Sequence, residues 1–553
     1  MYNKNLFAAI FILTIIGFTA CEKSEDLLDD TEDAEEIVLV DDCGDHDDAE
    51  DYIWDSSEEI QIILNGSTIT VNGSGATADG STVTITSAGI YNLTGSLSDG
   101  QVIVNTDDDD IVRLILNGVD LNCSTNAPIY VLSAEKAMIV LADNTDNYVS
   151  DGTSYIFENT EDDEPNAAIF SKSDLTIYGN GTVTVEGNYN DGIASKDGLI
   201  ITSGIINVNS VDDGIRGKDY LIVKDGSITV EAAGVGLKSD NGDDVSMGYI
   251  TIETGEINIT TGGEAIEAEK DVEITLGEIV LSSGGKGIDG TISVIIDGGN
   301  FTINSVDDAI HSNGFITIND GSFVISSDDD AIHADYDLVI NDGDINIANS
   351  YEGIESAEGD ITINGGEIHL VSSDDGLNLA ANGTHYLYIN GGYIVIDAEA
   401  DCFDSNGSME ISGGTVFVSS SGVRGGTIVD CDSYTVDGGF MVGLSASSQH
   451  TANPSTSSDQ YSLVIDFSSS QQEGTLIHIQ DSDGVDILTY EPTKEYEAFI
   501  FSSSDFVSGS TYDVYLGGSS TGTAIDGLYI DGTYTAGSKY ASFTISSMVT
   551  TIN

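Results

Sequence analysis

The sequence predicts an all-β fold: a right-handed parallel β-helix of about 22 residues per coil, in roughly eleven or more coils, with a C-terminal antiparallel β cap. Three observations predict it. From about residue 60 onward, apolar and polar residues alternate over short runs rich in Val, Ile and Thr. Gly, Asn and Asp separate those runs, and one unit recurs at a nearly constant spacing.

The repeat is clearest at an apolar anchor residue that follows an Asp-Gly or Asp-Ala pair. Six of the ten intervals between successive anchors are 22 residues long. A unit of this length without a helical period is one coil of a β-helix, in which each inward residue stacks on its equivalent about 4.8 Å away. We therefore expect the anchors to form an internal stack. The anchors are Ile169, Ile193, Ile215, Leu237, Ile266, Ile288, Ile310, Ile332, Ile354, Leu377 and Phe403.

The first residues predict export. Lys4 precedes an apolar run from Leu6 to Phe18, which is too short to span a membrane. The run ends in FTAC, which resembles a bacterial lipobox, so residues 1–21 are predicted to be a lipoprotein signal peptide with lipid attachment at Cys21. An ordinary secretory peptide with a chance cysteine is the alternative. The predicted location is the outer membrane of a Gram-negative bacterium, at the cell surface.

The charge of the chain limits its partners. It has 15 Lys and Arg against 95 Asp and Glu, a formal net charge of −80. Nucleic acid is excluded as a partner because phosphate backbones bind basic surfaces. Anionic lipids are disfavoured too, so we expect membrane contact only through the lipid anchor, and a monomer. Residues 22–59 carry a dense run of acids and are predicted to be an extended, disordered tether.

The remaining chain divides at the end of the repeat. Residues 60–433 are assigned to the β-helix, and residues 434–553 to the cap. The cap region holds a Ser-rich loop followed by strand-like runs such as YSLVIDFSS and TLIHIQDS. Cysteine spacing fits no zinc motif. We interpret Cys43, Cys123, Cys402 and Cys431 as small buried residues, or as at most one or two disulfides.

The repeat also gathers acidic residues two and three positions before the anchors. Stacked carboxylates about 4.8 Å apart repel by roughly 1 kcal/mol in water and by several times more in a drier site. Ca²⁺ takes about six to eight hard oxygen ligands, so several ions bridging adjacent coils would remove this repulsion. A solvated edge that discourages aggregation is the alternative. The predicted calcium ligands are Asp191, Asp212, Asp213, Asp307, Asp308, Asp329, Asp330, Glu352, Asp374, Asp375 and Asp401.

Four further residues are candidates for contact with a substrate. His311 and His333 directly follow their anchors, so they should face outward on adjacent coils, as a polar ladder or as a metal-binding pair. Tyr351 and Tyr386 offer flat rings on which a sugar can stack, although an isolated tyrosine is more often an ordinary strand residue.

The chain resembles exported bacterial carbohydrate-binding β-helix proteins, a family of the clostridial cellulose- and pectin-binding type with a polysaccharide-lyase-like fold. The resemblance rests on the Asp-Asp-Gly-Ile type of repeat with Gly-Gly turns. It also rests on DSDGVDILTYEPTKEYEAFIFSSSDFVSGSTYDVYLGG, from Asp481 to Gly518, and on DGLYIDGTYTAG, from Asp526. It implies bound calcium at the repeat aspartates and sugar binding without established catalysis.

Three functions are consistent with these features. The first is a calcium-loaded, surface-anchored lipoprotein that binds a plant-type or acidic polysaccharide. The second is a calcium-dependent polysaccharide lyase in which a Lys or Arg removes the C5 proton of a uronate; Lys286 is the first candidate base, followed by Arg216 and Lys238. Lys286 has a simpler interpretation as a neutraliser of neighbouring carboxylates. The third function is a structural adhesin that calcium makes rigid.

Overall fold

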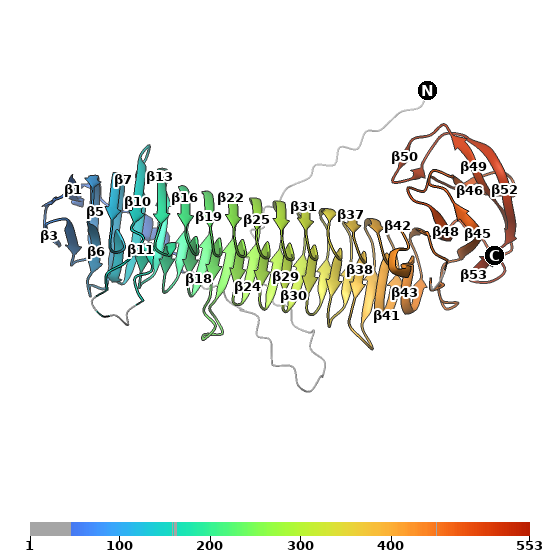
Figure 1. Ribbon diagram of the computed structural model, residues 1–553, viewed down its shortest axis with the longest axis horizontal. Coiled ribbons are helices and arrows are strands. Elements are labelled where there is room, and N and C mark those ends of the chain that lie inside the picture. The colour runs from blue at the N-terminus through green and yellow to red at the C-terminus, as the bar shows by residue number, and fades with distance from the viewer. Residues whose placement is uncertain (1–45, 158, 160–162, 449–450) are drawn as a thin grey trace, which may run out of the picture.

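The protein is a parallel β-solenoid of about 16 turns that ends in antiparallel strands, which confirms the predicted fold class (Figure 1). This computed structural model describes residues 46–157, 159, 163–448 and 451–553. The predicted signal peptide, Cys21, Cys43 and most of the predicted tether lie outside the described residues. Within these ranges, no helix is both long and apolar enough to cross a membrane.

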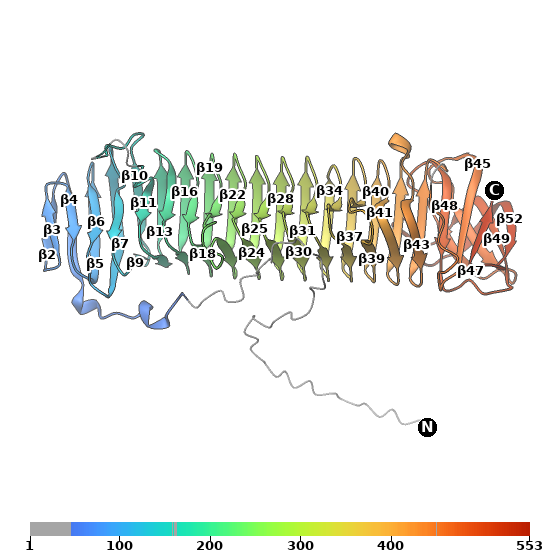
Figure 2. The ribbon, with the colours of Figure 1, turned by 90° about the horizontal axis from the view of Figure 1, so that it is seen from below.

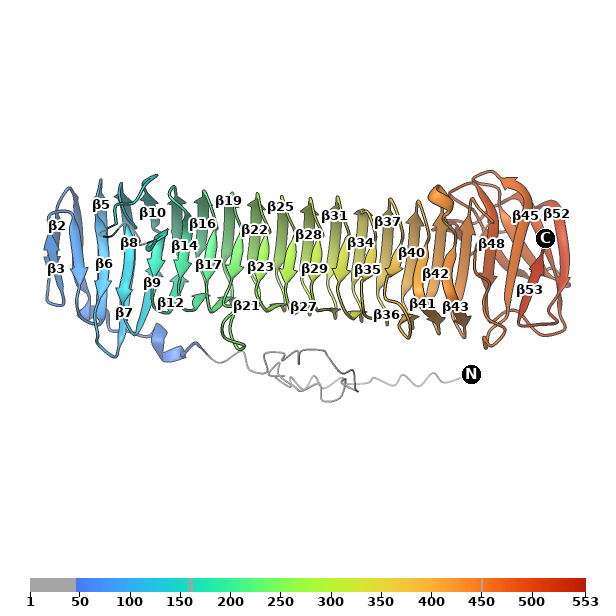
Figure 3. The same cartoon turned by 60° about the horizontal axis from the view of Figure 1, so that its bottom comes forward.

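Each regular coil contributes one strand to each of three parallel ladders, which we call sheets A, B and C (Figures 2 and 3). Sheet A contains β1 (Ile60–Gly66), β5 (Gly89–Leu97), β7 (Ile111–Cys123), β10 (Asp146–Asp151), β13 (Thr182–Gly187), β16 (Ile205–Ser210), β19 (Ser227–Ala232), β22 (Glu256–Thr261), β25 (Glu278–Ser283), β28 (Asn300–Ser305), β31 (Ser322–Ser327), β34 (Asp344–Asn349), β37 (Glu367–Ser372), β40 (Tyr393–Ala398), β42 (Thr415–Ser420) and β44 (Phe440–Ser445).

Sheet B contains β4 (Thr82–Ile85), β6 (Gln101–Asn105), β8 (Ile129–Ser133), β11 (Ala167–Ser171), β14 (Asp191–Ser195), β17 (Ile215–Gly217), β20 (Leu237–Ser239), β23 (Ile266–Ala268), β26 (Ile288–Gly290), β29 (Ile310–Ser312), β32 (Ile332–Ala334), β35 (Ile354–Ser356), β38 (Leu377–Leu379), β41 (Phe403–Ile411) and β43 (Val429–Val436). Sheet C contains β9 (Lys136–Leu141), β12 (Leu175–Gly179), β15 (Leu199–Ile201), β18 (Tyr220–Val223), β21 (Tyr249–Ile252), β24 (Asp271–Ile274), β27 (Ser293–Ile296), β30 (Phe315–Ile318), β33 (Leu338–Ile340), β36 (Ile361–Ile363) and β39 (Tyr386–Ile389). The second halves of β41 and β43 extend sheet C, and so does the first half of β7, which pairs with β9.

The predicted anchors form one internal column in sheet B, as expected. Each pairs in register with the next, from Ile169 opposite Ile193 to Leu377 opposite Phe403, and all are fully buried. A residue with apolar neighbours on the coils above and below is removed from water on every side, so this column stabilises the solenoid together with the buried columns of sheets A and C.

Shortening one anchor tests this column. We expect Ile310→Ala to lower the free energy of unfolding by about 2–5 kcal/mol, because the coils cannot close the cavity that it leaves. Chemical denaturation followed by circular dichroism measures the change. Val324→Ala on the outer face of β31 is the matched control: its side chain is 48% exposed, and the expected change is about 0.5 kcal/mol or less. Equal losses in the two variants would contradict a buried stack.

Antiparallel strands cover both ends of the solenoid. At the N-terminal end, β2 (Ile69–Asn72) pairs with β1 and β3 (Ala76–Asp79) pairs with β4, which the sequence did not predict. At the other end, β44 pairs with β48. The C-terminal strands are β45 (Ser462–Gln471), β46 (Ile477–Asp481), β47 (Asp486–Tyr490), β48 (Tyr496–Ser502), β49 (Thr511–Ser520), β50 (Ala524–Ile525), β51 (Leu528–Tyr529), β52 (Tyr534–Thr544) and β53 (Val549–Ile552). The parallel ladder reaches Ser445, beyond the predicted boundary at 433, because β43 and β44 keep the strand alternation without the Asp-Gly-Ile signature.

The prediction of a disordered tether through residue 59 is wrong for residues 46–59, which pack against the outer face of sheet C. The ring of His46 stacks on Tyr220 with centroids 4.1 Å apart. Asp51 forms an ion pair with Lys136 at 2.8 Å. Rings and cations on the solenoid therefore hold this acidic segment in place. The three short 3-10 helices of the described chain are η1 (Ala49–Tyr52), η2 (Ser56–Glu58) and η3 (Val423–Gly425).

The described cysteines fit the interpretation as buried residues. Cys123 and Cys402 are buried, Cys431 is partly buried, and all three are free thiols. Burial raises the pKa of the Cys123 thiol, so this group stays protonated and unreactive at neutral pH.

Candidate functional site

The acidic residues that precede the anchors line the corner between sheets A and B, which we call the acid corner. One oxygen of each aspartate two residues before its anchor accepts the N–H of the equivalent residue on the next coil. Asp308 Oδ1 accepts from Asp330 at 3.1 Å, Asp330 Oδ1 from Glu352 at 3.0 Å, and Asp375 Oδ1 from Asp401 at 2.8 Å. These carboxylates therefore satisfy corner N–H groups that sheet pairing leaves open. This structural role was not predicted. It leaves the second oxygen of Asp308 and of Asp375 for another partner, whereas the second oxygen of Asp330 lies 3.0 Å from His333 Nδ1.

Three groups of carboxylates come together along the acid corner. In each group, one oxygen from every member lies within 4.8 Å of the others. The groups are Asp307, Asp308 and Asp329; Asp330, Glu352 and Glu355; and Asp375, Asp401 and Asp404. Glu355 and Asp404 were missing from the predicted ligands. Each directly follows its anchor, and strand alternation already indicated that this position points outward beside the acid corner.

Burial and mutual repulsion raise the pKa of two of these carboxylates, Glu355 and Asp375, most strongly. Burial, followed by the neighbouring Asp330 and Glu352 carboxylates, raises the pKa of Glu355 to about 10. Burial, together with the charges of Asp404 and Asp401, raises the pKa of Asp375 to about 8, although the Asp401 N–H opposes the shift. Without a cation, these two carboxyl groups therefore hold protons at neutral pH.

On the first coils of the predicted calcium column, basic side chains, and not a cluster of carboxylates, lie beside the aspartates. Arg216 lies 3.9 Å from Asp191, and Lys238 lies 3.3 Å from Asp213. Asp191, Asp212 and Asp213 join no group of three possible metal ligands in the described part of the chain. The predicted calcium set is therefore brought together only on the coils that follow residue 306.

An exposed ring stands within the acid corner. The Tyr351 N–H donates to the Asp329 carbonyl at 2.8 Å, and the Tyr351 carbonyl accepts from Asp374 at 2.9 Å, so Tyr351 occupies the same column. Its side chain is 38% exposed. The Arg424 guanidinium lies 6.0 Å from the ring centroid and forms an ion pair with Asp374. Asp374 is thereby neutralised, and Arg424 joins the site from 73 residues away, where no sequence signal pointed to it.

The other predicted substrate contacts lie elsewhere. His311 and His333 are neighbours on the outer face of sheet B, beside the acid corner, with ring centroids 5.3 Å apart. Tyr386 begins β39 in sheet C and stacks on Tyr388 with centroids 5.1 Å apart. Only Tyr351 among the predicted tyrosines therefore adjoins the carboxylate groups.

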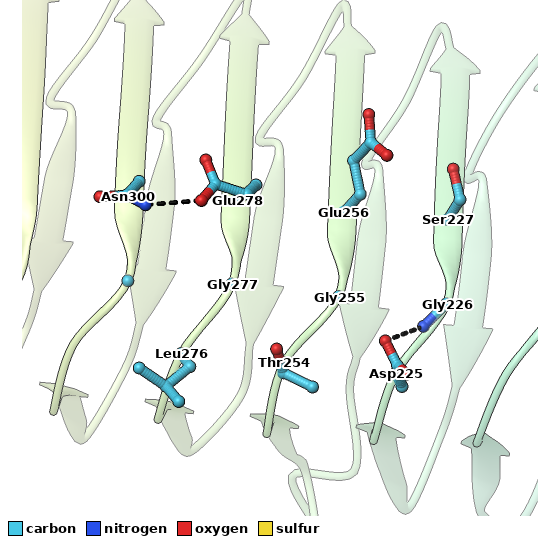
Figure 4. Close-up of a pocket in the computed structure, with 11 residues that line it drawn as sticks. Asp225, Gly226, Ser227, Thr254, Gly255, Glu256, Leu276, Gly277, Glu278 and Asn300 are labelled. Atoms are coloured by element: carbon cyan, nitrogen blue, oxygen red, sulfur yellow. Dashed lines mark hydrogen bonds between the residues drawn. The ribbon is translucent and has the colours of Figure 1, made fainter.

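A shallow groove follows the opposite corner, between sheets C and A (Figure 4). Its floor is a column of glycines. At Gly299 a side chain is disfavoured by φ of 113° and would be crowded by the Gly277 backbone, whose carbonyl oxygen lies 3.1 Å from the position of a Cβ. Glu278 accepts from the Asn300 amide at 2.6 Å along its rim. Nearby, side-chain amides bond from coil to coil, as Asn341 does to Asn319 at 2.7 Å. The asparagine side chains in this column therefore bond to one another from coil to coil. The groove presents no aromatic ring and no carboxylate group of three.

Comparison with known proteins identifies relatives along the solenoid. A model of the family described as "Carbohydrate-binding domain-containing protein" matches residues 79–331 and 287–432, well over half of the chain. A curated protein with the same description, from Acetivibrio thermocellus, is 42% identical over 139 residues. That match covers 25% of this chain and 49% of the relative, so the chain spans about half the length of that protein. A solved structure, a polysaccharide lyase-like protein from C. thermocellum as its gadolinium derivative, is 35% identical with a TM-score of 0.41, and the match covers 42% of this chain and 93% of that one.

Proposed function

Because the chain belongs to the family of carbohydrate-binding domain-containing proteins, we propose that it is a calcium-binding lipoprotein that recognises an acidic or plant-type polysaccharide at the cell surface. The observation that carries the proposal is the acid corner, where three carboxylate groups from adjacent coils lie beside an exposed ring and an arginine. The lipid anchor is inferred from the lipobox-like sequence at Cys21.

The donor set supports a hard divalent cation. All members of the three groups are carboxylates, and Ca²⁺ binds oxygens at about 2.3–2.6 Å, so two oxygens on one ion are at most about 5 Å apart. The separations within 4.8 Å meet this limit. Calcium would supply positive charge to which a sugar carboxylate can bind. The residues that would hold it are Asp307, Asp308, Asp329, Asp330, Glu352, Glu355, Asp375, Asp401 and Asp404.

The side chains beside these groups suit a uronate polymer. The net charge of −80 repels an acidic glycan, so recognition needs local positive charge. Arg424, whose side chain is 60% exposed, offers a guanidinium that matches the geometry of a carboxylate. The Tyr351 ring lies beneath it and offers a face for a sugar ring. Arg424 and bound calcium would bind the carboxylate of one uronate residue, and Tyr351 would stack on its ring.

The lyase alternative lacks comparable support. A general base works best with a pKa near the operating pH. Burial alone would lower the pKa of Lys238, but the Asp213 and Glu267 carboxylates raise it above its ordinary value. Arg216 is held by Asp240 at 2.6 Å, and Lys286 lies 3.7 Å from Asp289. Each candidate base is thus engaged with a carboxylate.

Glycan binding tests the proposal. We expect immobilised polygalacturonate to retain the purified protein in calcium and to release it on chelation. Tyr351→Ala is expected to weaken binding about three- to tenfold, the equivalent of a ring contact of about 0.5–1.5 kcal/mol. Arg424→Ala should weaken it as well. Tyr386→Ala is the matched control, since this tyrosine is 36% exposed but lies on sheet C, away from the acid corner.

The outcomes separate the alternatives. Retention that is indifferent to chelation, or an equal loss in Tyr386→Ala, would contradict the proposed site. Calcium-dependent stability without retention on any glycan would favour the structural adhesin. Release of unsaturated sugar products would favour the lyase.

A further inference from the structure

We propose that His311, His333 and Asp335 form a site of a second kind, for a divalent transition-metal ion of the zinc class. The two histidines pair in register on β29 and β32, and one ligand atom from each of the three side chains lies within 4.8 Å of the others. Two imidazole nitrogens and one carboxylate favour zinc, cobalt or nickel over calcium, which prefers oxygen ligands. The inference does not depend on the glycan function.

Both imidazoles are already held in the orientation that such a site needs. Nδ1 of His311 lies 2.7 Å from Asp289 Oδ1, and Nδ1 of His333 lies 3.0 Å from Asp330 Oδ2. These carboxylates engage the inner nitrogen of each ring and leave Nε2 as the available ligand. A carboxylate behind each histidine is the usual second shell of a metal-bound imidazole. A ladder of solvent-facing histidines would need no such pair of supports.

The surroundings leave one side of the site open. His311 is 6% exposed, whereas the Asp335 side chain is 40% exposed and its Oδ1 lies 3.7 Å from His333 Nε2. Asp308 Oδ2, 4.0 Å from His311 Nε2, closes the side toward the acid corner. Zinc with three protein ligands keeps a fourth position for water or another ligand, and that position would face solvent beside Asp335.

Cobalt spectroscopy tests the site. The purified full-length protein is titrated with Co²⁺ in excess Ca²⁺, which fills the oxygen sites, and the visible absorption of tetrahedral cobalt is recorded. We expect one such ion per chain, displaced by Zn²⁺. Asp289→Asn should lower the affinity about tenfold as a positioning residue, and His333→Gln and Asp335→Asn should each lower it further. His369→Gln is the matched control, because His369 lies near Glu367 and Asp526 and neighbours no second histidine among the described contacts.

Several results would overturn the proposal. These are the absence of tetrahedral cobalt absorption in the unmodified protein, an equal loss of affinity in His369→Gln, or wild-type affinity in both His333→Gln and Asp335→Asn. An absorption spectrum of octahedral, oxygen-only cobalt would place the ion in the acid corner and would also overturn it. Asp335 is the most exposed ligand, so Asp335→Asn keeps the test decisive if a histidine variant fails to fold.

Discussion

Chelation of calcium is expected to lower the free energy of unfolding by several kcal/mol. A ligand that binds only the folded state stabilises it by about 2.7 kcal/mol when it is present at 100 times its Kd. The acid corner offers three carboxylate groups, so the stabilisation should exceed that of one site. Chemical unfolding of the purified protein in calcium and in chelator measures the difference. The same unfolding measurement in Mg²⁺ tests whether the site selects calcium, because Mg²⁺ requires shorter bonds and near-octahedral geometry.

Glu355→Gln distinguishes loss of a calcium ligand from damage to the fold. With a pKa of about 10, Glu355 is protonated at neutral pH when no cation is bound, so an amide is a close replacement in chelator. In calcium, the same change removes a charged ligand and should reduce the stabilisation. Asp342→Asn is the control, because this carboxylate accepts only the N–H of Gly343 in its own turn among the described hydrogen bonds. Equal stability with and without calcium, or a Glu355→Gln loss that is the same in both media, would contradict calcium binding there.

The solenoid could be predicted because its periodicity is written directly into the sequence. An apolar residue that recurs every 22 residues within alternating strands has one position that buries all copies, the internal column. The start of that column was harder to see. Val83, Val102 and Ile129 occupy it before Ile169, but no Asp-Gly or Asp-Ala pair directly precedes any of them. These coils have only the alternation of apolar and polar residues. A search for the repeat motif therefore could not locate them.

The candidate site was only partly predictable. The repeat spacing predicts that the acids stack in columns. It does not predict which of them lie beside a basic side chain, so the pairing of Asp191 with Arg216 was not expected. Arg424 reaches the acid corner from η3, whose position depends on how the last coils fold. The docking of residues 46–59 depends on outward rings such as Tyr220, which a repeat pattern treats as solvent-facing. The sequence therefore predicted contacts between adjacent coils but did not predict contacts between distant segments.

The pH dependence of stability is expected to change sign when calcium is removed. In chelator, the folded state raises the pKa of Asp375 from 3.8 to about 8 and so binds its proton more tightly than the unfolded chain does. Stability should therefore fall as the pH rises from about 4 to about 8. At roughly 1.4 kcal/mol per pKa unit, Asp375 alone accounts for on the order of 5 kcal/mol. In calcium the ionised carboxylates are the ligands and protons compete with the ion, so stability should rise over the same window.

Asp375→Asn separates these two effects in one residue. The amide oxygen can still accept the Asp401 N–H, which Asp375 now accepts at 2.8 Å, but the side chain cannot ionise. In chelator at about pH 8 the variant should be more stable than the unmodified protein, and its stability should depend less on pH. In calcium it should be less stable, because a ligand is lost. Denaturation midpoints at about pH 5 and about pH 8 measure both changes. A variant that is less stable in both media would contradict calcium binding at Asp375. It would mean that this residue contributes only hydrogen bonds and packing to the acid corner.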